Sequence, residues 1–208
     1  MTQYKIPNAT VKRLPLYHRY FQFLHDSNKQ KISSTELADA VQVDSATIRR
    51  DFSYFGSLGK RGYGYEVEPM LEFFQKLLNQ DQTSNVGLVG VGNLGNALLN
   101  YNFSQTNNIR IVAAFDNNPA IIGNEVNGVL VYSIDEVRDQ LIKQKIDVVI
   151  LSVPVRSAQP VADKLVEAGV KGILNFTPLR ISTPTKVRVH NVDLANELQT
   201  LIYFLDNC

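Results

Sequence analysis

The spacing of hydrophobic residues changes near residue 80 of this chain. Before that point, apolar side chains such as Leu14 and Phe21 recur at intervals that place them on one face of a helix. After it, continuous apolar runs such as "DVVILSV" alternate with amphipathic stretches, as in parallel strands that helices cover on both faces. The intervening segment 80–85, "QDQTSN", has no apolar residue. We therefore predict a helical domain over residues 1–80 and an α/β domain over residues 81–190.

Local signals divide the N-terminal domain into short helices. Ser33 and Glu36 have the spacing of a capping box at a helix start, and either Asp44 or Ser45 can cap a helix that follows the break "QVD". Two short helices joined by a tight turn have the outline of a helix-turn-helix. The glycines of "GKRGYGYEV" supply turns between residues able to pair as strands, and residues 69–79 form one more amphipathic helix. This order predicts a winged-helix domain.

A glycine-rich turn opens the α/β domain. It follows a predicted strand, precedes a predicted helix and consists of Gly90, Val91, Gly92, Asn93, Leu94 and Gly95. Gly90 suits a tight turn, Gly92 lets backbone approach a pyrophosphate, and Gly95 lets the helix pack closely. Asp116 ends the next strand, 21 residues after Gly95, where an acid hydrogen-bonds the adenosine ribose. The pattern predicts a Rossmann-like dinucleotide site, although a purely structural strand-turn-helix remains an alternative.

The residues around this turn also indicate which dinucleotide it binds. A carboxylate at Asp116 repels a 2′-phosphate, and "DNNPAIIG" contains no Arg or Lys to neutralise one, so NAD(H) is favoured over NADP(H). The alternative for Asp116 is a residue that only begins a loop. Val153, Pro154 and Phe176 follow later strands and are predicted to form an apolar nicotinamide environment. Phe176 is equally well explained as a core aromatic.

The helix "SATIRRDFSYF" has two unlike faces. Ile48, Phe52 and Phe55 share an apolar face that can anchor it, as a recognition helix requires. The residues predicted to contact DNA, on the other face and at the wing, are Ser45, Ala46, Thr47, Arg49, Arg50, Ser53, Tyr54, Lys60, Arg61 and Gly62. Arg50 suits either a guanine edge or a phosphate. A solvated helix whose arginines bind nothing is the alternative.

Charge and composition narrow the class of protein. The net charge is only +1, but Lys and Arg outnumber Asp and Glu by 11 to 8 in residues 1–80, whereas acids outnumber bases by 12 to 10 in residues 81–208. The only cysteine is Cys208, so we expect no disulfide, cysteine cluster or other metal site. The start lacks a signal-peptide core, and no apolar run is long enough to cross a bilayer. A cytoplasmic protein is expected.

No catalytic arrangement accompanies the predicted nucleotide site. A dehydrogenase needs a proton donor or acceptor beside the nicotinamide, yet His18, His25 and His190 lie in settings that suggest structural or surface roles. We therefore expect no enzyme and no catalytic residue. Two alternatives stay open: a small NAD-dependent reductase whose N-terminal helices only dimerise, and a partner domain that binds a nucleotide or coenzyme A.

With both halves considered, the chain resembles the Rex family of bacterial redox-sensing transcriptional repressors. The resemblance rests on "DFSYFG", "GKRGYGY" and "VGVGNLGNALLNY", and extends through "VADKLVEAGVKGILNFTP" to "VDLANELQTLIYFL". It implies a homodimer that binds palindromic operator DNA when NADH is scarce and releases it when NADH binds, so that NAD(H) is a regulatory ligand.

The resemblance also implies roles for the end of the chain and for three polar residues. Residues 191–208 would form a dimerisation helix exchanged between subunits, although its leucine stripe also fits an ordinary core. Arg19, Tyr101 and Asp193 match the polar group that links domain positions near the nicotinamide. Two departures concern Thr47, where many relatives carry glutamine, and the loop "NYNFSQTNNIR", which lacks the glycines often found there.

Overall fold

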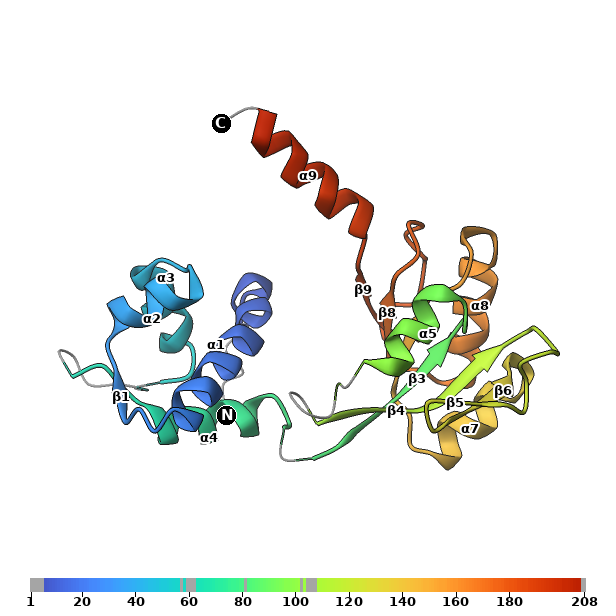
Figure 1. Cartoon of the computed structure of the whole chain (residues 1–208), viewed down its shortest axis with the longest axis horizontal. Helices are drawn as coiled ribbons and strands as arrows, with labels where there is room; N and C mark the ends of the chain where they lie inside the picture. The colour runs from blue at the N-terminus through green and yellow to red at the C-terminus, as the bar shows by residue number, and fades with distance from the viewer. Residues whose placement is uncertain are drawn as a thin grey trace. The chain divides into compact units, whose positions relative to one another are not determined.

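The computed structural model divides the chain into two compact units, Met1–Gln82 and Thr83–Cys208 (Figure 1). It describes residues 6–56, 58, 63–80, 82–101, 103 and 108–206. The N-terminal unit contains α1 (Asn8–Asp26), β1 (Lys31–Ile32), α2 (Ser34–Val41), α3 (Ser45–Ser53), β2 (Tyr65–Glu66) and α4 (Val67–Leu77).

The helices of the N-terminal unit pack around an aromatic core. Tyr17 and Phe21 of α1, Phe52 of α3 and Phe74 of α4 are all buried, and Phe52 meets the ring of Tyr17 edge-on at 5.2 Å between centroids. As the sequence predicts, Ile48 and Phe52 are buried, and Phe55 packs against the same core. The apolar faces of α1 and α4 therefore pack against the apolar face of α3, the predicted recognition helix.

Short-range signals set the helix starts of this unit. The capping box of Ser33 and Glu36 is present, with the Ser33 Oγ accepting a hydrogen bond from the Glu36 backbone. Asp44, rather than Ser45, caps α3 and accepts a hydrogen bond from the Thr47 backbone at 2.9 Å. Both caps satisfy N–H groups that have no partner within the helix.

The small sheet of this unit pairs strands that lie far apart in the sequence. Strand β2, which follows the glycine-rich stretch, pairs antiparallel with β1, which precedes α2. The helix-turn-helix of α2 and α3 therefore lies, in sequence, between two paired strands. The sequence gives no hint of β1 as the partner. The predicted wing residues Lys60, Arg61 and Gly62 lie outside the described residues.

The C-terminal unit is built on one largely parallel sheet. Its strands are β3 (Ser84–Val89), β4 (Ile109–Asp116), β5 (Glu125–Val126), β6 (Val129–Ser133), β7 (Val148–Leu151), β8 (Gly172–Asn175) and β9 (Arg188–Asn191). Among the described residues they follow the order β5-β6-β4-β3-β7-β8-β9, and every pair is parallel except β5 with β6. The order reverses beside β3, which confirms the predicted Rossmann-like topology.

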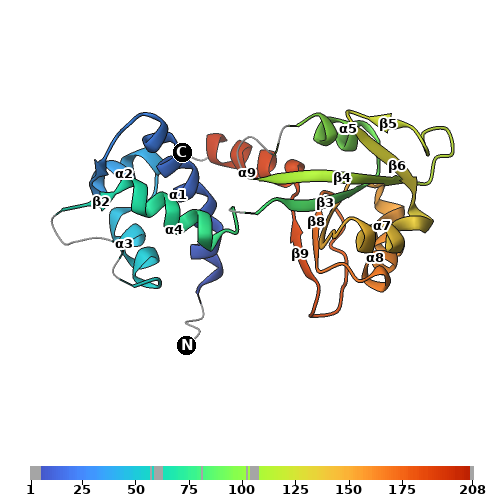
Figure 2. The same cartoon turned by 90° about the horizontal axis from the view of Figure 1, so that it is seen from below.

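Helices cover both faces of this sheet (Figure 2). They are α5 (Asn93–Asn100), the short η1 (Ile134–Glu136), α7 (Val137–Lys143) and α8 (Val155–Ala168). A further helix, α9 (Leu194–Asp206), follows β9 and does not pack on the sheet. Leu141 of α7 and Leu165 of α8 share one apolar cluster with the sheet, while Leu99 of α5 belongs to a cluster on the other face. The predicted capping box of Ser133 and Glu136 is also present.

The last helix carries apolar side chains that the single chain leaves exposed. Leu194, Leu198, Leu201 and Leu205 are each more than half exposed. The alternative that this stripe belongs to an ordinary core is therefore wrong for one chain taken alone. An apolar stripe of this kind is typical of a surface that another element covers.

Candidate nucleotide pocket and recognition helix

The turn between β3 and α5 needs glycine at two of its three glycine positions. Gly90 has a φ of 93°, and a Cβ there would lie 2.5 Å from the carbonyl oxygen of Ser152. A Cβ on Gly95 would fall far inside van der Waals contact with the carbonyl oxygen of Gly90. Gly92, in contrast, has an ordinary φ and nothing within 4 Å of its Cβ position. The space beside Gly92 is therefore open to a ligand.

Asp116 is tied to the glycine turn and to its own loop. One carboxylate oxygen accepts a hydrogen bond from the Val91 backbone at 2.8 Å, and the other accepts from the backbones of Asn117 and Asn118. The side chain is half-buried. Asp116 therefore begins the loop after β4 and also faces the glycine turn, while its hydrogen bond to a ribose stays a prediction.

A cavity of about 520 Å³ lies at this end of the sheet. Its size is in the range of small-molecule and cofactor sites. Of the residues predicted to bind the dinucleotide, those that line it are Gly90, Val91, Gly92, Asp116, Val153 and Pro154. The carboxyl ends of β3, β4 and β7 therefore converge on one cavity, as expected for an open parallel sheet.

The remaining predicted residues of the site lie elsewhere. Asn93, Leu94 and Gly95 start α5 and do not line the cavity. Phe176 is half-buried and packs against the apolar cluster that also includes Leu99. The core interpretation of Phe176 is thus the one that its contacts support.

Sequence reasoning missed several residues of the cavity. Ile121, Ile134 and Arg156 line it, from the loop after β4, the start of η1 and the first turn of α8. Each follows a strand whose carboxyl end faces the site, which is the signal that would have identified it. Arg156 brings a positive charge that a search limited to "DNNPAIIG" does not detect.

Ser152 joins the ends of two neighbouring strands at the cavity. Its hydroxyl lies 2.9 Å from the carbonyl oxygen of Gly90 and 3.2 Å from that of Val89, so it donates to the glycine turn from the end of β7. This bond holds the turn in the conformation that leaves Gly92 facing open space.

The outer face of α3 presents small, polar and basic side chains. Ala46, Arg49, Arg50 and Ser53 are exposed, and Ser45, Thr47 and Tyr54 are partly exposed. Arg49 lies 3.4 Å from the hydroxyl oxygens of Ser34 and Ser45. Among the described residues, the Arg50 side chain makes no hydrogen bond or ion pair, so its guanidinium is available to an external anion.

The three predicted coupling residues lie at element ends or on a surface. Tyr101 follows α5, is 61% exposed and stacks edge-on with Phe103. Asp193 caps α9, where it accepts a hydrogen bond from the Asn196 backbone at 3.1 Å. Arg19 is exposed on α1 of the other unit, so its relation to the other two stays a prediction.

No group of three or more His, Cys, Asp or Glu side chains is arranged to hold a metal ion in the described residues. None of the helices that the structure describes has the length and apolar character needed to span a membrane.

Comparison with known proteins identifies both units. Residues 5–53 match a family model described as a putative DNA-binding protein N-terminus, and residues 81–179 match one described as a CoA binding domain. The redox-sensing transcriptional repressor Rex of Lactobacillus gasseri is 65% identical over 207 residues, which cover this whole chain and 97% of the relative. That of Lactiplantibacillus plantarum is 62% identical and is covered to 92%.

Solved structures agree with these relatives. A structure of RSP in complex with beta-NAD+ and operator DNA has a TM-score of 0.91 at 38% identity, and the match covers 98% of this chain and 94% of the other. A structure of RSP with beta-NADH has a TM-score of 0.87 at 36% identity, with 98% and 96% covered. A DNA-binding unit and a Rossmann-like unit thus occur together along matching full-length chains, and this chain belongs to the Rex family of redox-sensing transcriptional repressors.

Proposed function

We propose that this chain represses transcription by binding operator DNA through α3 and that NADH, bound at the glycine turn, releases it. The observation that carries the proposal is the cavity lined by Gly92 and Asp116, because it pairs an open backbone approach with a carboxylate at the end of β4. RSP, a Rex-family repressor, has been crystallised with beta-NAD+ and operator DNA and with beta-NADH.

The cavity suits an adenine dinucleotide at three points. Gly92, the N-cap of α5, lines the cavity, so the positive end of the helix dipole favours a pyrophosphate there. The Asp116 carboxylate can accept hydrogen bonds from ribose hydroxyls, and Ile121 and Ile134 provide an apolar wall. We infer that NAD(H) is the ligand and that it regulates rather than reacts, since the full-length relatives are named transcriptional repressors.

The DNA-binding surface is the outer face of α3 together with the predicted wing. Arg50 is exposed and unpaired among the described residues, as a base- or phosphate-contacting side chain must be before DNA arrives. The contacts of Ser45, Ala46, Thr47, Arg49, Ser53, Tyr54, Lys60, Arg61 and Gly62 with DNA remain part of the proposal.

A palindromic operator requires two copies of α3. The exposed leucine stripe of α9 is proposed to pair two chains, with the helix exchanged between them. Recognition helices of such dimers enter successive major grooves about 34–36 Å apart. Arg19, Tyr101 and Asp193 are proposed to link nucleotide binding to that spacing.

Thermodynamic linkage provides the test of this proposal. If NADH weakens DNA binding, operator DNA must weaken NADH binding by the same factor, typically about 1–3 kcal/mol. NADH is titrated by fluorescence with and without an operator duplex, and the control is Arg50→Ala at a duplex concentration too low for this weakened variant to bind. We expect weaker NADH binding in the presence of DNA for the unmodified chain alone. Equal NADH affinity under both conditions refutes the mechanism.

The family model that matches residues 81–179 favours one competing ligand. Its description is that of a CoA binding domain, and Arg156 in the cavity would suit a phosphorylated ligand. Calorimetry with NADH, NADPH and coenzyme A distinguishes the three. We expect NADH to bind most tightly, because Asp116 disfavours the 2′-phosphate of NADPH. Tighter binding of coenzyme A would replace NADH in this proposal.

A further inference from the structure

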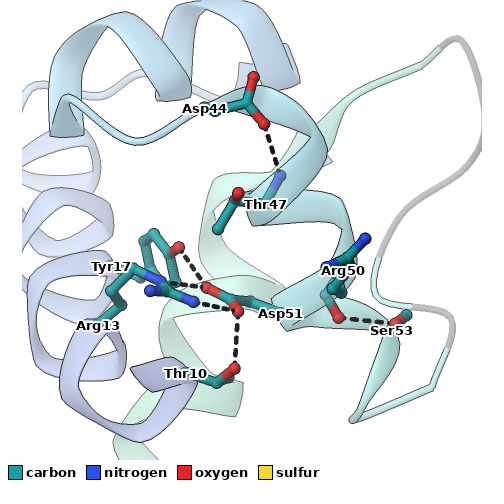
Figure 3. A network of polar contacts seen from close by, with 8 residues as sticks. All are labelled: Thr10, Arg13, Tyr17, Asp44, Thr47, Arg50, Asp51 and Ser53. Atoms are coloured by element: carbon teal, nitrogen blue, oxygen red, sulfur yellow. Dashed lines mark hydrogen bonds and ion pairs between the residues drawn. The ribbon is translucent and has the colours of Figure 1, made fainter. Parts of the chain in front are cut away.

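A buried carboxylate on the recognition helix is held entirely by side chains of α1 (Figure 3). Arg13 donates to both oxygens of Asp51, at 2.6 Å from Nε and 2.7 Å from Nη2. Thr10 donates to Oδ1 at 2.8 Å, and Tyr17 donates to Oδ2 at 2.7 Å. Each carboxylate oxygen therefore accepts two hydrogen bonds, and the Asp51 side chain is only 2% exposed.

The sequence spacing explains why these donors converge. Thr10, Arg13 and Tyr17 are separated by three and four residues, so they lie on one face of α1. On α3, Asp51 stands between exposed Arg50 and buried Phe52. The inner face of α3 is thereby attached to α1, one residue away from a side chain that points outward.

The chemistry of this cluster differs from that of the surrounding apolar core. Aromatic contacts such as that between Tyr17 and Phe52 favour burial but tolerate small rotations. A bidentate pair between a guanidinium and a carboxylate is planar and directional. Burial by itself would raise the pKa of Asp51, but the hydrogen bonds from Arg13, Tyr17 and Thr10 outweigh it and hold this pKa below its ordinary value. The pair is therefore ionised at neutral pH.

Stability alone is a poor explanation for such a pair. Replacing a buried ion pair by well-packed apolar residues is often neutral or stabilising, because removing two charges from water is costly. What apolar residues would not reproduce is a fixed angle between α1 and α3. Arg13 is thereby oriented by two hydrogen bonds to Asp51, although its side chain stays 27% exposed.

We propose that Asp51, held by Thr10, Arg13 and Tyr17, is a positioning residue that sets the orientation of the recognition helix and with it the selectivity for operator sequence. The inference rests on the proposed DNA-binding function. A tilt of α3 would misplace Arg50 against base edges, whereas contacts to phosphates, which are long-range and tolerant, would change little.

The test uses mild variants of the full chain, because Asp51→Ala would leave the buried hydroxyls of Thr10 and Tyr17 without their partner. Arg13→Lys keeps the charge and removes the bidentate fork, and Thr10→Val removes one donor at nearly constant shape. Phe21→Leu is the matched control, since it weakens the same core and removes none of the four hydrogen bonds to Asp51. An operator is first selected from random duplexes with the unmodified protein, and fluorescence anisotropy then measures affinity for that operator and for a random duplex at one salt concentration.

We expect Arg13→Lys and Thr10→Val to lower the ratio of operator affinity to random-duplex affinity about tenfold, with random binding changed less than twofold. Phe21→Leu should lower thermal stability and keep the ratio. A ratio kept within twofold in both cluster variants overturns the positioning role while leaving the proposed function intact. If Arg13→Lys weakens binding to the random duplex as much as binding to the operator, and also lowers the salt dependence of binding, the positioning role is overturned, because Arg13 is then a phosphate contact. No sequence preference in the unmodified protein contradicts both proposals.

Discussion

The two glycines at the start of α5 predict opposite outcomes for the same substitution. In Gly95→Ala the new Cβ would overlap the carbonyl oxygen of Gly90 and lie 3.0 Å from its carbonyl carbon and 3.3 Å from the Ser152 hydroxyl. The obstructing atoms are mostly backbone, and Gly90 is itself closely packed, since a Cβ there would lie 2.5 Å from the Ser152 carbonyl oxygen. Overpacking of this kind costs about 1–3 kcal/mol. We expect a loss near the upper end, which lowers the melting temperature by about 10 °C.

Gly92→Ala should leave the protein stable and weaken its ligand. The position has a φ of −75° and open space around it, so an alanine fits the free protein. Two effects on the free energy of unfolding oppose one another, and each is below about 1 kcal/mol. Alanine is a poorer N-cap than glycine, which destabilises the protein, but it also makes the unfolded chain less flexible, which stabilises it. The added methyl group would nonetheless occupy the approach of a pyrophosphate. Losing one or two charge-assisted hydrogen bonds of about 1.5–3 kcal/mol each corresponds to at least a tenfold weaker affinity for NADH.

Both variants are measured by thermal denaturation without ligand and by fluorescence titration with NADH. The expected result separates them, with stability lost in Gly95→Ala and affinity lost at unchanged stability in Gly92→Ala. Full NADH affinity in Gly92→Ala would show that the pyrophosphate does not approach this turn. Unchanged stability in Gly95→Ala would mean that α5 does not pack against the turn as closely as the structure has it.

Three further predictions concern other parts of the chain. Asp116→Ala should lower the affinity for NADH at least tenfold, measured by calorimetry, and leave operator binding unchanged, measured by gel shift. Loss of DNA binding as well would point to general unfolding. Burial lowers the pKa of His18, so the unfolded chain binds a proton more readily than the folded one. The free energy of unfolding should therefore be unaffected by this group above its ordinary pKa of about 6.5 and should decrease as the pH falls below that value. Denaturant titrations at pH 7.5 and 5.5 should show this decrease in the unmodified chain and a smaller one in His18→Gln. An equal decrease in unfolding free energy in both proteins would contradict the prediction. Leu198→Asp should yield monomers in sedimentation and weak operator binding, whereas a stable dimer would remove α9 from the interface.

The predictions that the structure confirms depend on short stretches of chain. The capping boxes at Ser33 and Ser133 bring together residues three apart, so their spacing is sufficient to identify them. The buried strands β3, β4 and β7 are continuous apolar runs that no surface helix would contain. The order of these elements, in turn, leaves few topologies besides a doubly covered parallel sheet.

The parts that the sequence did not reveal depend on contacts between distant residues. Strand β1 has only two residues, and its partner β2 follows 33 residues later, so no local pattern marks the pair. The position of Phe176 after a strand end predicts a place at the nicotinamide, but its side chain packs with the cluster that includes Leu99 and does not line the cavity. Leu174 and Phe176 alternate onto the sheet face that packs with Leu99, away from the residues that line the cavity.

The charge of the recognition helix shows how such a distant contact changes a conclusion from sequence. Counted along the chain, Asp51 is the single acid among Arg49, Arg50, Lys60 and Arg61, and it dilutes their positive charge. In the structure its carboxylate is buried and paired with Arg13, 38 residues earlier, so the two charges cancel inside the domain. The outer face of α3 is left with Arg49 and Arg50 and no nearby acid of its own helix. Because an unscreened cation attracts phosphate more strongly than a paired one, the inward turn of Asp51 makes this face more basic than its composition indicates.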